Sequence, residues 1–394
     1  MIQPATARDE RIDALRGFAL LGILLVNIQS FAWGGANPAG YLLEDATVLD
    51  RALFFFTVAF INMKFMPLFA MLFGVGFSLL LNKLHAVTAS PHAVFRRRML
   101  FLFVFGMLHG VFFYFGDITQ MYAMAGMVLL LYDERGIASL RRALAVWWIG
   151  AVALAILLTW GLAGNVADPA DMAVELEANF AVFTQGSWLD QLPTRASLFL
   201  DIVIANVIGL PMAVALMLTG MLAHRSGWLA DRTASAWRIA LLSGLALGLP
   251  SAFVYGGLLY AEADRYGLSA FSAIAAVPGT LSVTLAFAYA ALFFTRASPG
   301  VIAWLAPAGR MPLTNYLLQS VAMGALLSGW GLALAPRLGY AETALLAVVV
   351  FIGQVELSRW WLRRRKQGPL EHAWRQWTYY RMEPRASSPV RSGE

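Results

Sequence analysis

Residues 99–115 read MLFLFVFGMLHGVFFYF, and this stretch decides the class of fold. Apart from His109, every residue in it is aliphatic, aromatic or glycine, with no polar face at the helical period. An amphipathic helix of a soluble protein would show polar residues every three or four positions. A block of this length and composition is typical of a helix that crosses a membrane.

Similar blocks recur along the whole chain. Hydrophobic residues make up 59% of the 394 positions and charged residues only 13%, whereas a soluble domain carries about 25% charged residues. We therefore predict an all-α, polytopic transmembrane helix bundle with about ten spans, forming a single domain over residues 1–380, followed by a disordered cytoplasmic tail over 381–394. The predicted spans are Gly17–Trp33, Phe65–Leu81, Met99–Phe115, Ile118–Tyr132, Ala143–Ala163, Leu198–Leu222, Ile239–Tyr260, Ala270–Thr295, Met311–Ala333 and Glu342–Trp361.

Three segments do not fit the simple pattern of spans and short loops. Ala52–Leu81 is too long for one upright helix and is interrupted at residues 62–64, which predicts a short interfacial or re-entrant piece before the second span. The acidic stretch Asn165–Pro193 is predicted as an outer loop, which either folds over the outer mouth or is simply solvated. The first hydrophobic stretch is predicted as a retained helix, with a cleaved signal peptide as the alternative.

The positions of the basic residues predict the orientation. With both termini in the cytoplasm, cytoplasmic segments hold 24 of the 29 Lys and Arg residues, as the positive-inside rule requires. The same bias explains the net charge of +6 without a nucleic-acid partner. The basic run Arg363–Lys366 is accordingly interpreted as a stop-transfer and lipid-headgroup anchor. These features predict a multi-pass protein of a bacterial inner membrane.

Polar residues inside the predicted spans are the functional signal, because each costs free energy in hydrocarbon unless it is paired or hydrated. Arg16 and Asn27 are eleven residues apart, which places them on one helix face with Asn27 about 16 Å deeper. Arg98 and His109 have the same spacing on the third span. We interpret Asn27 and His109 as candidate catalytic residues; the alternative is that they only bond neighbouring helices.

Further polar residues occur near the ends of other spans. Lys64 and Asp117 are predicted at the outer side, either as an ion pair or as a substrate-facing pair. The ninth span opens at Arg310 and carries Asn315 and Gln319 on one face, because they are four residues apart. This polarity predicts that the span lines a cavity or packs in the middle of the bundle, within reach of a ligand that enters past the arginines.

The sequence predicts no metal site. There is no cysteine, so thiolate ligands and disulfides are excluded. His85 and His92 lie in a cytoplasmic segment without a carboxylate nearby in sequence. Soluble-enzyme motifs such as G-x-S-x-G and H-E-x-x-H are also absent.

Four motifs together resemble the YeiB-like family of bacterial inner-membrane proteins. The resemblance runs from Arg11 to about Tyr380, and that family is grouped with transmembrane acyltransferases such as the lysosomal heparan-α-glucosaminide N-acetyltransferase. The motifs are RIDALRGFALLGI at 11–23, LHG at 108–110 with GDI at 116–118, GRMPLTNYLLQS at 309–320, and GPLE at 368–371.

The resemblance implies an acyl-transfer path near the start of the chain. The first helix has an Arg, ten residues and an Asn, as in the lysosomal type, which implies that Arg16 and Asn27 lie near acyl-CoA. One departure is that residues 28–50 contain no His, whereas the lysosomal-type enzyme has its catalytic His in that loop. The nearest candidate is His109, on another helix.

The function predicted from these observations is membrane acyl transfer. Acyl-CoA, most simply acetyl-CoA, would be the cytoplasmic co-substrate, with its phosphates on Arg16, Arg98 and Arg310. Topology alone also explains arginines at that side. His109 would act as base and Asn27 as donor to the oxyanion. The acceptor would be an amine or hydroxyl of an outer-side glycan or lipid, and membrane lipids and a second copy of the chain are the other partners considered. The alternatives are a transporter or lipid flippase with a polar midplane path, and a non-catalytic partner of another enzyme.

Overall fold

The structure is a computed structural model that describes residues 9–33, 46–162, 169–231, 233, 235–263, 277–380 and 382. The described residues are helical throughout, with no strand among them. The elements are α1 (Glu10–Ala32), α2 (Val48–Phe56), the π-helix η2 (Thr57–Ile61), α3 (Phe65–Val87), α4 (Pro91–Phe112), α5 (Thr119–Leu129), the 3-10 helix η3 (Leu130–Tyr132), α6 (Ile137–Leu162), α7 (Pro169–Gln185), α8 (Gln191–Arg225), α9 (Ser235–Ser243), the π-helix η4 (Gly244–Gly248), α10 (Leu249–Ala263), α12 (Leu285–Arg296), α13 (Pro299–Arg310), α14 (Pro312–Leu327), the 3-10 helix η5 (Ala335–Arg337), α15 (Tyr340–Leu362) and α16 (Pro369–Tyr379).

Seven helical segments of the described chain are long and apolar enough to cross a membrane, which confirms a helical membrane protein. Three helices at predicted spans do not meet that measure. In α4 the cluster Arg96–Arg98 lies in the second turn, while α5 and α14 are short. The first part of the predicted span Ala270–Thr295 lies outside the described residues, as do residues 381 and 383–394 of the predicted tail. The seven segments are Glu10–Ala32, Val48–Val87, Ile137–Leu158, Gln191–Arg225, Ser235–Tyr260, Val277–Arg296 and Tyr340–Leu362.

Helix α1 is the central element of the bundle, and its closest neighbour is α13. The two helices touch through their backbones at Gly17 and Gly309. A Cβ on Gly309 would lie 1.7 Å from the carbonyl oxygen of Asp13, and one on Gly17 would lie 2.4 Å from that of Leu305. Any side chain at either position would therefore push the helices apart, as expected for small residues at membrane-helix crossings. Helices α3 and α8 cross in the same way at Gly74 and Gly220.

The chain breaks between η2 and α3, at the interruption expected from the sequence. Met63 has a positive φ of 60°, and Lys64 begins the turn into α3. Lys64 is fully buried, and its Nζ donates to the carbonyl of Val58 at 3.3 Å. The lysine thus satisfies a backbone acceptor that the break leaves free.

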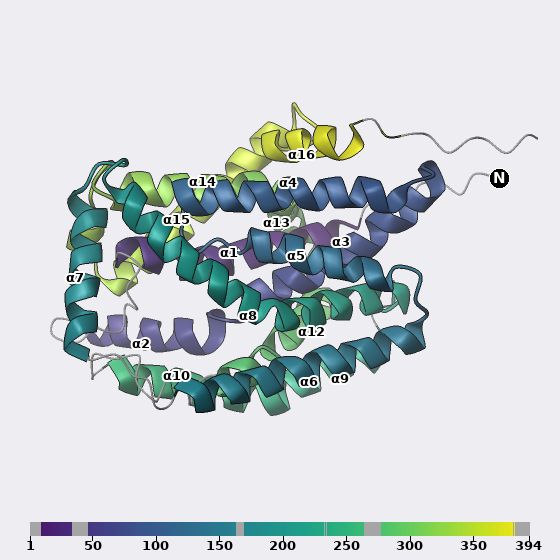
Figure 1. Cartoon of the computed structure of the whole chain (residues 1–394), viewed down its shortest axis with the longest axis horizontal. Helices are drawn as coiled ribbons and strands as arrows, with labels where there is room; N and C mark the ends of the chain where they lie inside the picture. The colour runs from purple at the N-terminus through teal and green to yellow at the C-terminus, as the bar shows by residue number, and fades with distance from the viewer. Residues whose placement is uncertain are drawn as a thin grey trace, which may run out of the picture.

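Two helices outside the predicted spans enclose the bundle (Figure 1). The stretch expected as an outer loop contains α7, which crosses one end of the bundle at a steep angle to α4. Helix α16 lies along the outside of α4. The indole Nε1 atoms of Trp374 and Trp377 donate to the carbonyls of Arg98 and Arg97, at 2.9 and 3.1 Å. These bonds attach the C-terminal helix to the first half of α4.

Candidate functional site

His109 lies in a buried hydrogen-bonded cluster between α4, α14 and the turn after α4. Its Nδ1 is 2.7 Å from Oδ2 of Asp117, and its Nε2 is 3.0 Å from Oγ of Ser320. The three side chains are only 1%, 0% and 2% exposed. Since a carboxylate accepts at Nδ1, a neutral imidazole carries its proton there and leaves Nε2 to accept from the serine hydroxyl. The cluster therefore has the connectivity of a Ser–His–Asp triad.

Asp117 is held in place by the turn that joins α4 to α5. Its Oδ1 accepts from the backbone N and from Oγ1 of Thr119, both at 2.7 Å. Its carbonyl accepts from Nδ2 of Asn206 on α8 at 3.0 Å. Gly106 on α4 makes room for this turn, because a Cβ there would lie 2.4 Å from Oγ1 of Thr119. One carboxylate oxygen is thereby occupied, and the other is directed at His109.

This position differs from the rim position expected for Asp117. Asn206 lies near the middle of the 35-residue helix α8, so its partner Asp117 lies inside the bundle. The turn that joins α4 to α5 packs against this part of α8. Among the described residues Asp117 forms no ion pair with Lys64, which contacts the carbonyl of Val58 and the ring of Tyr255 instead.

A cavity of about 400 Å³ opens between α1, α3, α4, α14 and α16. We call it the basic cavity, and the end of the bundle where its charges gather the basic end. Its far wall is formed by Ile118, Thr119, Tyr122 and Tyr316. The basic side chains that line it are Arg16, Lys83, Arg98, Arg310 and Arg375.

Glu371 is the one carboxylate among the residues that line this cavity, and α14 already uses its charge. Oε1 accepts from the backbone N of Leu313 at 2.7 Å and of Thr314 at 3.0 Å, while Oε2 accepts from Oγ1 of Thr314 at 2.6 Å. A carboxylate at this position stabilises the positive end of the helix dipole. The other charged lining residues are basic, and of these Arg16 is ion-paired with the buried Asp13 at 3.1 Å. The remaining basic side chains therefore give the cavity an excess of positive charge, which favours an anion.

Tyr316 separates the basic cavity from the His109 cluster. Its ring lines the cavity, and its centroid is 4.8 Å from that of the His109 ring. Its buried hydroxyl lies near Asp117 but makes no hydrogen bond of normal geometry in the described structure. Ser320 follows one turn later on the same face of α14. The ring of Tyr316 therefore lies between the basic cavity and the imidazole of His109.

The structure separates the predicted cofactor-binding residues into two groups. Arg16, Arg98 and Arg310 line the basic cavity, whereas Asn315 and Gln319 are not among its lining residues. Nδ2 of Asn315 donates to Oγ of Ser358 at 3.0 Å, and Nε2 of Gln319 donates to Oε1 of Gln354 at 3.1 Å. These amides join α14 to α15. Nε2 of Gln319 also donates to the carbonyl of Leu20 on α1 at 3.3 Å. Their expected contact with a ligand stays a prediction.

Asn27 is buried on α1, as expected for a mid-helix polar residue. Among the described residues no hydrogen bond links it to His109, whose Nε2 contacts Ser320 instead. One turn further along α1, Oγ of Ser30 accepts from the hydroxyl of Tyr114 at 3.4 Å. The ring of Tyr114 is in turn 6.4 Å from that of His109. The role of Asn27 in catalysis stays a prediction.

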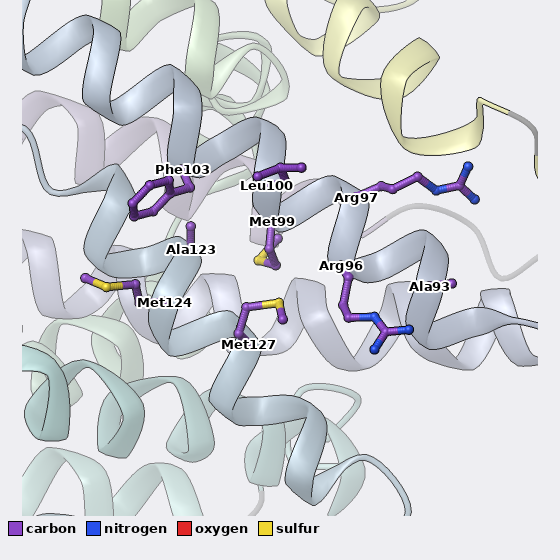
Figure 2. Close-up of a pocket in the computed structure, with 9 residues that line it drawn as sticks. All are labelled: Ala93, Arg96, Arg97, Met99, Leu100, Phe103, Ala123, Met124 and Met127. Carbon is purple, nitrogen blue, oxygen red and sulfur yellow. The ribbon is translucent and has the colours of Figure 1, made fainter.

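A second hollow lies on the outer surface of α4 and α5 (Figure 2). Its walls are apolar and rich in methionine, and Arg96 and Arg97 stand at one end. Neither His109 nor any residue of its cluster is part of this groove. Its place on the outside of the bundle suits the acyl chain of a membrane lipid better than a reacting group.

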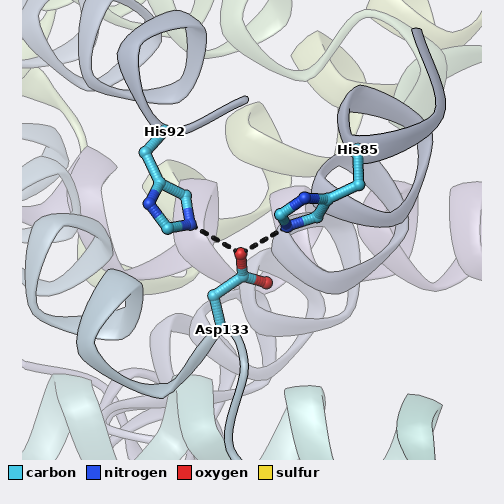
Figure 3. Close-up of side chains that lie close together, drawn as sticks. All are labelled: His85, His92 and Asp133. Carbon is cyan, nitrogen blue, oxygen red and sulfur yellow. Dashed lines mark hydrogen bonds and ion pairs between the residues drawn. The ribbon is translucent and has the colours of Figure 1, made fainter. Parts of the chain in front are cut away.

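A second histidine cluster lies at the basic end (Figure 3). Nε2 of His85 and Nε2 of His92 are each 2.7 Å from Oδ2 of Asp133. This contact could not be read from the sequence, because Asp133 is 48 and 41 residues away along the chain and only the fold brings it to the two histidines. Burial raises the pKa of Asp133, but the hydrogen bonds to His85 and His92 outweigh it and lower the pKa below its usual value. Arg225 also donates to Oδ1 at 3.2 Å.

Comparisons with known proteins find one family model that matches part of the chain and relatives that match nearly all of it. The family described as "Protein of unknown function (DUF418)" matches residues 223–381. The chain is 29% identical to the "Uncharacterized protein YeiB" of Escherichia coli (strain K12), over 98% of this chain and 100% of the relative. The chain is thus similar to YeiB over nearly its whole length. Among other relatives it is 26% identical to the "Uncharacterized protein YxaH" of Bacillus subtilis (strain 168), over 97% of this chain and 98% of that one. No solved structure matches the chain.

The DUF418 match covers part of the candidate site of this YeiB-like protein. It includes α14 with Tyr316 and Ser320, and α16 with Glu371. His109 and Asp117 lie outside the matched residues. The two halves of the His109 cluster thus come from regions more than 200 residues apart.

Sequence reasoning missed Ser320, Tyr316 and Asp133. Ser320 follows directly after Gln319, and the polarity of this helix was the available signal. The helical rotation that directs Ser320 towards His109 was not readable, since it depends on packing against α4. Asp133 lies in a short turn with no local motif, so its two histidine partners appear only in the folded chain.

Proposed function

We propose that this YeiB-like chain is an acyltransferase of the bacterial inner membrane, with ten spans and both termini in the cytoplasm. The basic end then faces the cytoplasm, in agreement with the distribution of Lys and Arg. The three additional spans are α4, α5 and α14, which are short or carry charges at one end. Each of them contributes to the basic cavity or to the His109 cluster, where neighbouring helices shield its polar groups from lipid.

The co-substrate proposed for the basic cavity is acyl-CoA, most simply acetyl-CoA. Its phosphates bind Arg16, Arg98 and Arg310, because guanidinium groups suit phosphate oxygens. His109 is eleven residues beyond Arg98 on α4, which corresponds to about 16 Å. An extended pantetheine arm bridges a distance of this order. The thioester then reaches Ser320 once the ring of Tyr316 has turned aside.

The observation that carries the proposal is the buried Asp117–His109–Ser320 cluster behind a basic cavity. Oγ of Ser320 attacks the thioester carbonyl while Nε2 of His109 takes its proton. The C–S bond breaks, and the thiolate recovers that proton and leaves as free CoA. Asp117 orients the ring and stabilises the imidazolium that forms.

The second half of the reaction releases the acyl group. A hydroxyl or amine of an outer-side glycan or lipid attacks the Ser320 ester, and His109 accepts the proton of that group. Oγ of Ser320 takes the proton back as its bond to the acyl carbon breaks. An acyl group on Ser320 would thus be taken from acyl-CoA on the cytoplasmic side and passed to an acceptor that enters from the outer side.

The test uses purified full-length protein in detergent with radiolabelled acetyl-CoA and no acceptor. We expect CoA and acetyl-CoA to raise the melting temperature of the protein. We also expect an acetyl group on the peptide that contains Ser320, absent in Ser320→Ala and strongly reduced in His109→Gln. Ser328→Ala is the matched control, because Ser328 is an equally buried serine at the end of the same helix.

Two outcomes would contradict the proposal at different levels. If CoA stabilises the protein but no label reaches Ser320, the chain binds the donor without the serine chemistry. If neither CoA nor acetyl-CoA changes the melting temperature, the acyltransferase proposal fails. A transporter that moves another anion through the basic cavity then becomes the better explanation.

A further inference from the structure

Three potential metal ligands converge at the basic end from three separate segments of the chain. His85 lies in the last turn of α3, His92 in the first turn of α4, and Asp133 directly after η3. The two Nε2 atoms and Oδ2 of Asp133 lie within 4.8 Å of one another. Figure 3 shows both imidazoles directed at Oδ2 of Asp133, one from each side.

The second carboxylate oxygen of Asp133 is held by Arg225 from α8. Nη2 of Arg225 lies 3.2 Å from Oδ1 and also donates to the carbonyl of Asp133 at 2.6 Å. Its Nη1 donates to the carbonyls of Tyr132 and Arg135, at 3.2 Å each. The carboxylate is thus fixed in orientation and offers only Oδ2 to the histidines. A carboxylate held by such an outer partner is the usual arrangement around metal ligands.

The two histidine side chains are partly exposed while the aspartate is buried, so an ion could enter this site from the solvent. Asp133 is 3% exposed, whereas the side chains of His85 and His92 are 39% and 40% exposed. The two rings stand at 80° to each other with centroids 5.8 Å apart. Ligand atoms around tetrahedral Zn²⁺ lie about 3.3 Å apart, given bonds of about 2.0–2.1 Å. To admit an ion, each Nε2 must therefore withdraw from Oδ2 by about 0.6 Å, and the two Nε2 atoms, which lie within 4.8 Å of each other, must come to a similar spacing of about 3.3 Å. The half-exposed rings leave room for both movements.

We propose that His85, His92 and Asp133 form a site for a divalent transition-metal ion, with Zn²⁺ as the preferred occupant. Two imidazoles and one carboxylate oxygen suit Zn²⁺, and they disfavour Ca²⁺ and Mg²⁺, which prefer sets of oxygen ligands. Three protein ligands leave a fourth position open to water. The bound ion would connect α3, α4 and the turn after η3, and the bond from Arg225 to Asp133 would connect it to α8 as well.

This inference does not depend on acyl transfer. The site shares no residue with the basic cavity or with the His109 cluster. Its main competitor is a purely hydrogen-bonded cluster in which both Nε2 atoms donate to Oδ2. A metal site should retain zinc, whereas a purely hydrogen-bonded cluster should not. A measurement of bound zinc therefore distinguishes the two.

The experiment uses full-length protein with an affinity tag that contains no histidine. The protein is stripped with EDTA, equilibrated with equimolar Zn²⁺, passed through a desalting column and analysed for metal. We expect about one zinc per chain, and a tenfold or greater loss of affinity in both His92→Gln and Asp133→Asn. His372→Gln is the matched control, because His372 is an exposed histidine outside the site. Cobalt(II) should give the intense visible absorption of a low-symmetry site in the wild type and lose it in His92→Gln.

Three results would overturn the proposal. The first is wild-type protein that retains no zinc after desalting. The second is zinc that persists unchanged in the double variant His85→Gln/His92→Gln, because the ion would then be bound elsewhere. The third is equal retention of Mg²⁺ and Zn²⁺, which would indicate unspecific attraction to carboxylates. The exposed His92 makes its variant a mild change, so its folding can be confirmed from an unchanged elution profile.

Discussion

The two histidine–aspartate clusters of this YeiB-like protein contain the same residue types in different surroundings. In the bundle interior, one imidazole lies between Asp117 and Ser320, and none of the three side chains is more than 2% exposed. At the basic end, two half-exposed imidazoles share one oxygen of Asp133. The first arrangement suits proton transfer between Ser320 and His109, with Asp117 orienting the ring. The second brings three potential metal-ligand atoms within 4.8 Å of one another. Histidine and aspartate therefore do not specify a chemistry; their number, order and access to water do.

The largest expected effect is on acetyl transfer, which should depend on the buried His109 cluster and not on the cluster at the basic end. His109→Gln should lower acetyl transfer from acetyl-CoA by about 10³-fold, because the base that accepts the serine proton is lost. His372→Gln serves as a control for loss of an unrelated histidine. Turnover is measured with radiolabelled acetyl-CoA in detergent. If His85→Gln caused the same loss, the two clusters would not differ in their chemistry as we infer.

The next largest expected effect is on the free energy of unfolding, which should fall further when Asp117 is replaced than when Asp133 is replaced. Asp117→Ala should lower the free energy of unfolding by about 3–5 kcal/mol, because it leaves His109 and the Thr119 donors buried without their acceptor. Asp133→Ala should cost only about 1–2 kcal/mol in metal-free protein, since its histidine partners regain water. Denaturant titrations in the same detergent give both values. Equal losses would show that burial does not distinguish the clusters.

Chelation should act on only one cluster. Removal of zinc by EDTA should lower the melting temperature by a few degrees, because an ion that binds only the folded chain stabilises it. Acetyl transfer by the surviving folded protein should be unchanged, since the His109 cluster needs no metal. A loss of turnover that zinc restores would instead connect the two clusters.

The smallest expected effect is on the free energy of unfolding, and it concerns Tyr316, which lies between the basic cavity and the His109 cluster. Tyr316→Phe should change the free energy of unfolding by less than about 1 kcal/mol, because the buried hydroxyl makes no hydrogen bond of normal geometry that could be lost. Tyr122→Phe is the matched comparison on the same wall, and should cost about 1–2 kcal/mol, since that hydroxyl donates to the carbonyl of Met66 at 2.6 Å. A large loss in Tyr316→Phe would mean that its hydroxyl bonds a group of the cluster.

Much of the fold could be predicted because its signals are local. Apolar blocks such as Met99–Phe115 indicate helices wherever they occur, and the structure has a helix at each predicted span that it describes. The interruption at residues 62–64 was likewise visible in the sequence and coincides with the positive φ of Met63. Helix α7 was missed because its polar composition resembles that of a solvated loop. Helix α13 was missed because its short apolar stretch was assigned to the connection before the ninth span.

The candidate site could be predicted only in part. Arg16, Arg98 and Arg310 were expected on one side of the membrane, and they line one cavity. His109 was selected by its depth, and it is the centre of the buried cluster. Asn315 and Gln319 were selected by the same reasoning and instead join α14 to α15. Polarity in a span shows that a side chain needs a partner, but it does not show which neighbour supplies it.

The sequence by itself determined the helical membrane class and the approximate positions of most helices. These properties follow from composition and spacing along one segment, because hydrocarbon excludes charge and unpaired backbone. Only the tertiary structure decided that Ser320 contacts His109 and that Asp133 joins His85 to His92. Such contacts depend on the rotation and depth of each helix against its neighbours, and close approaches such as that of Gly309 to Asp13 set that rotation.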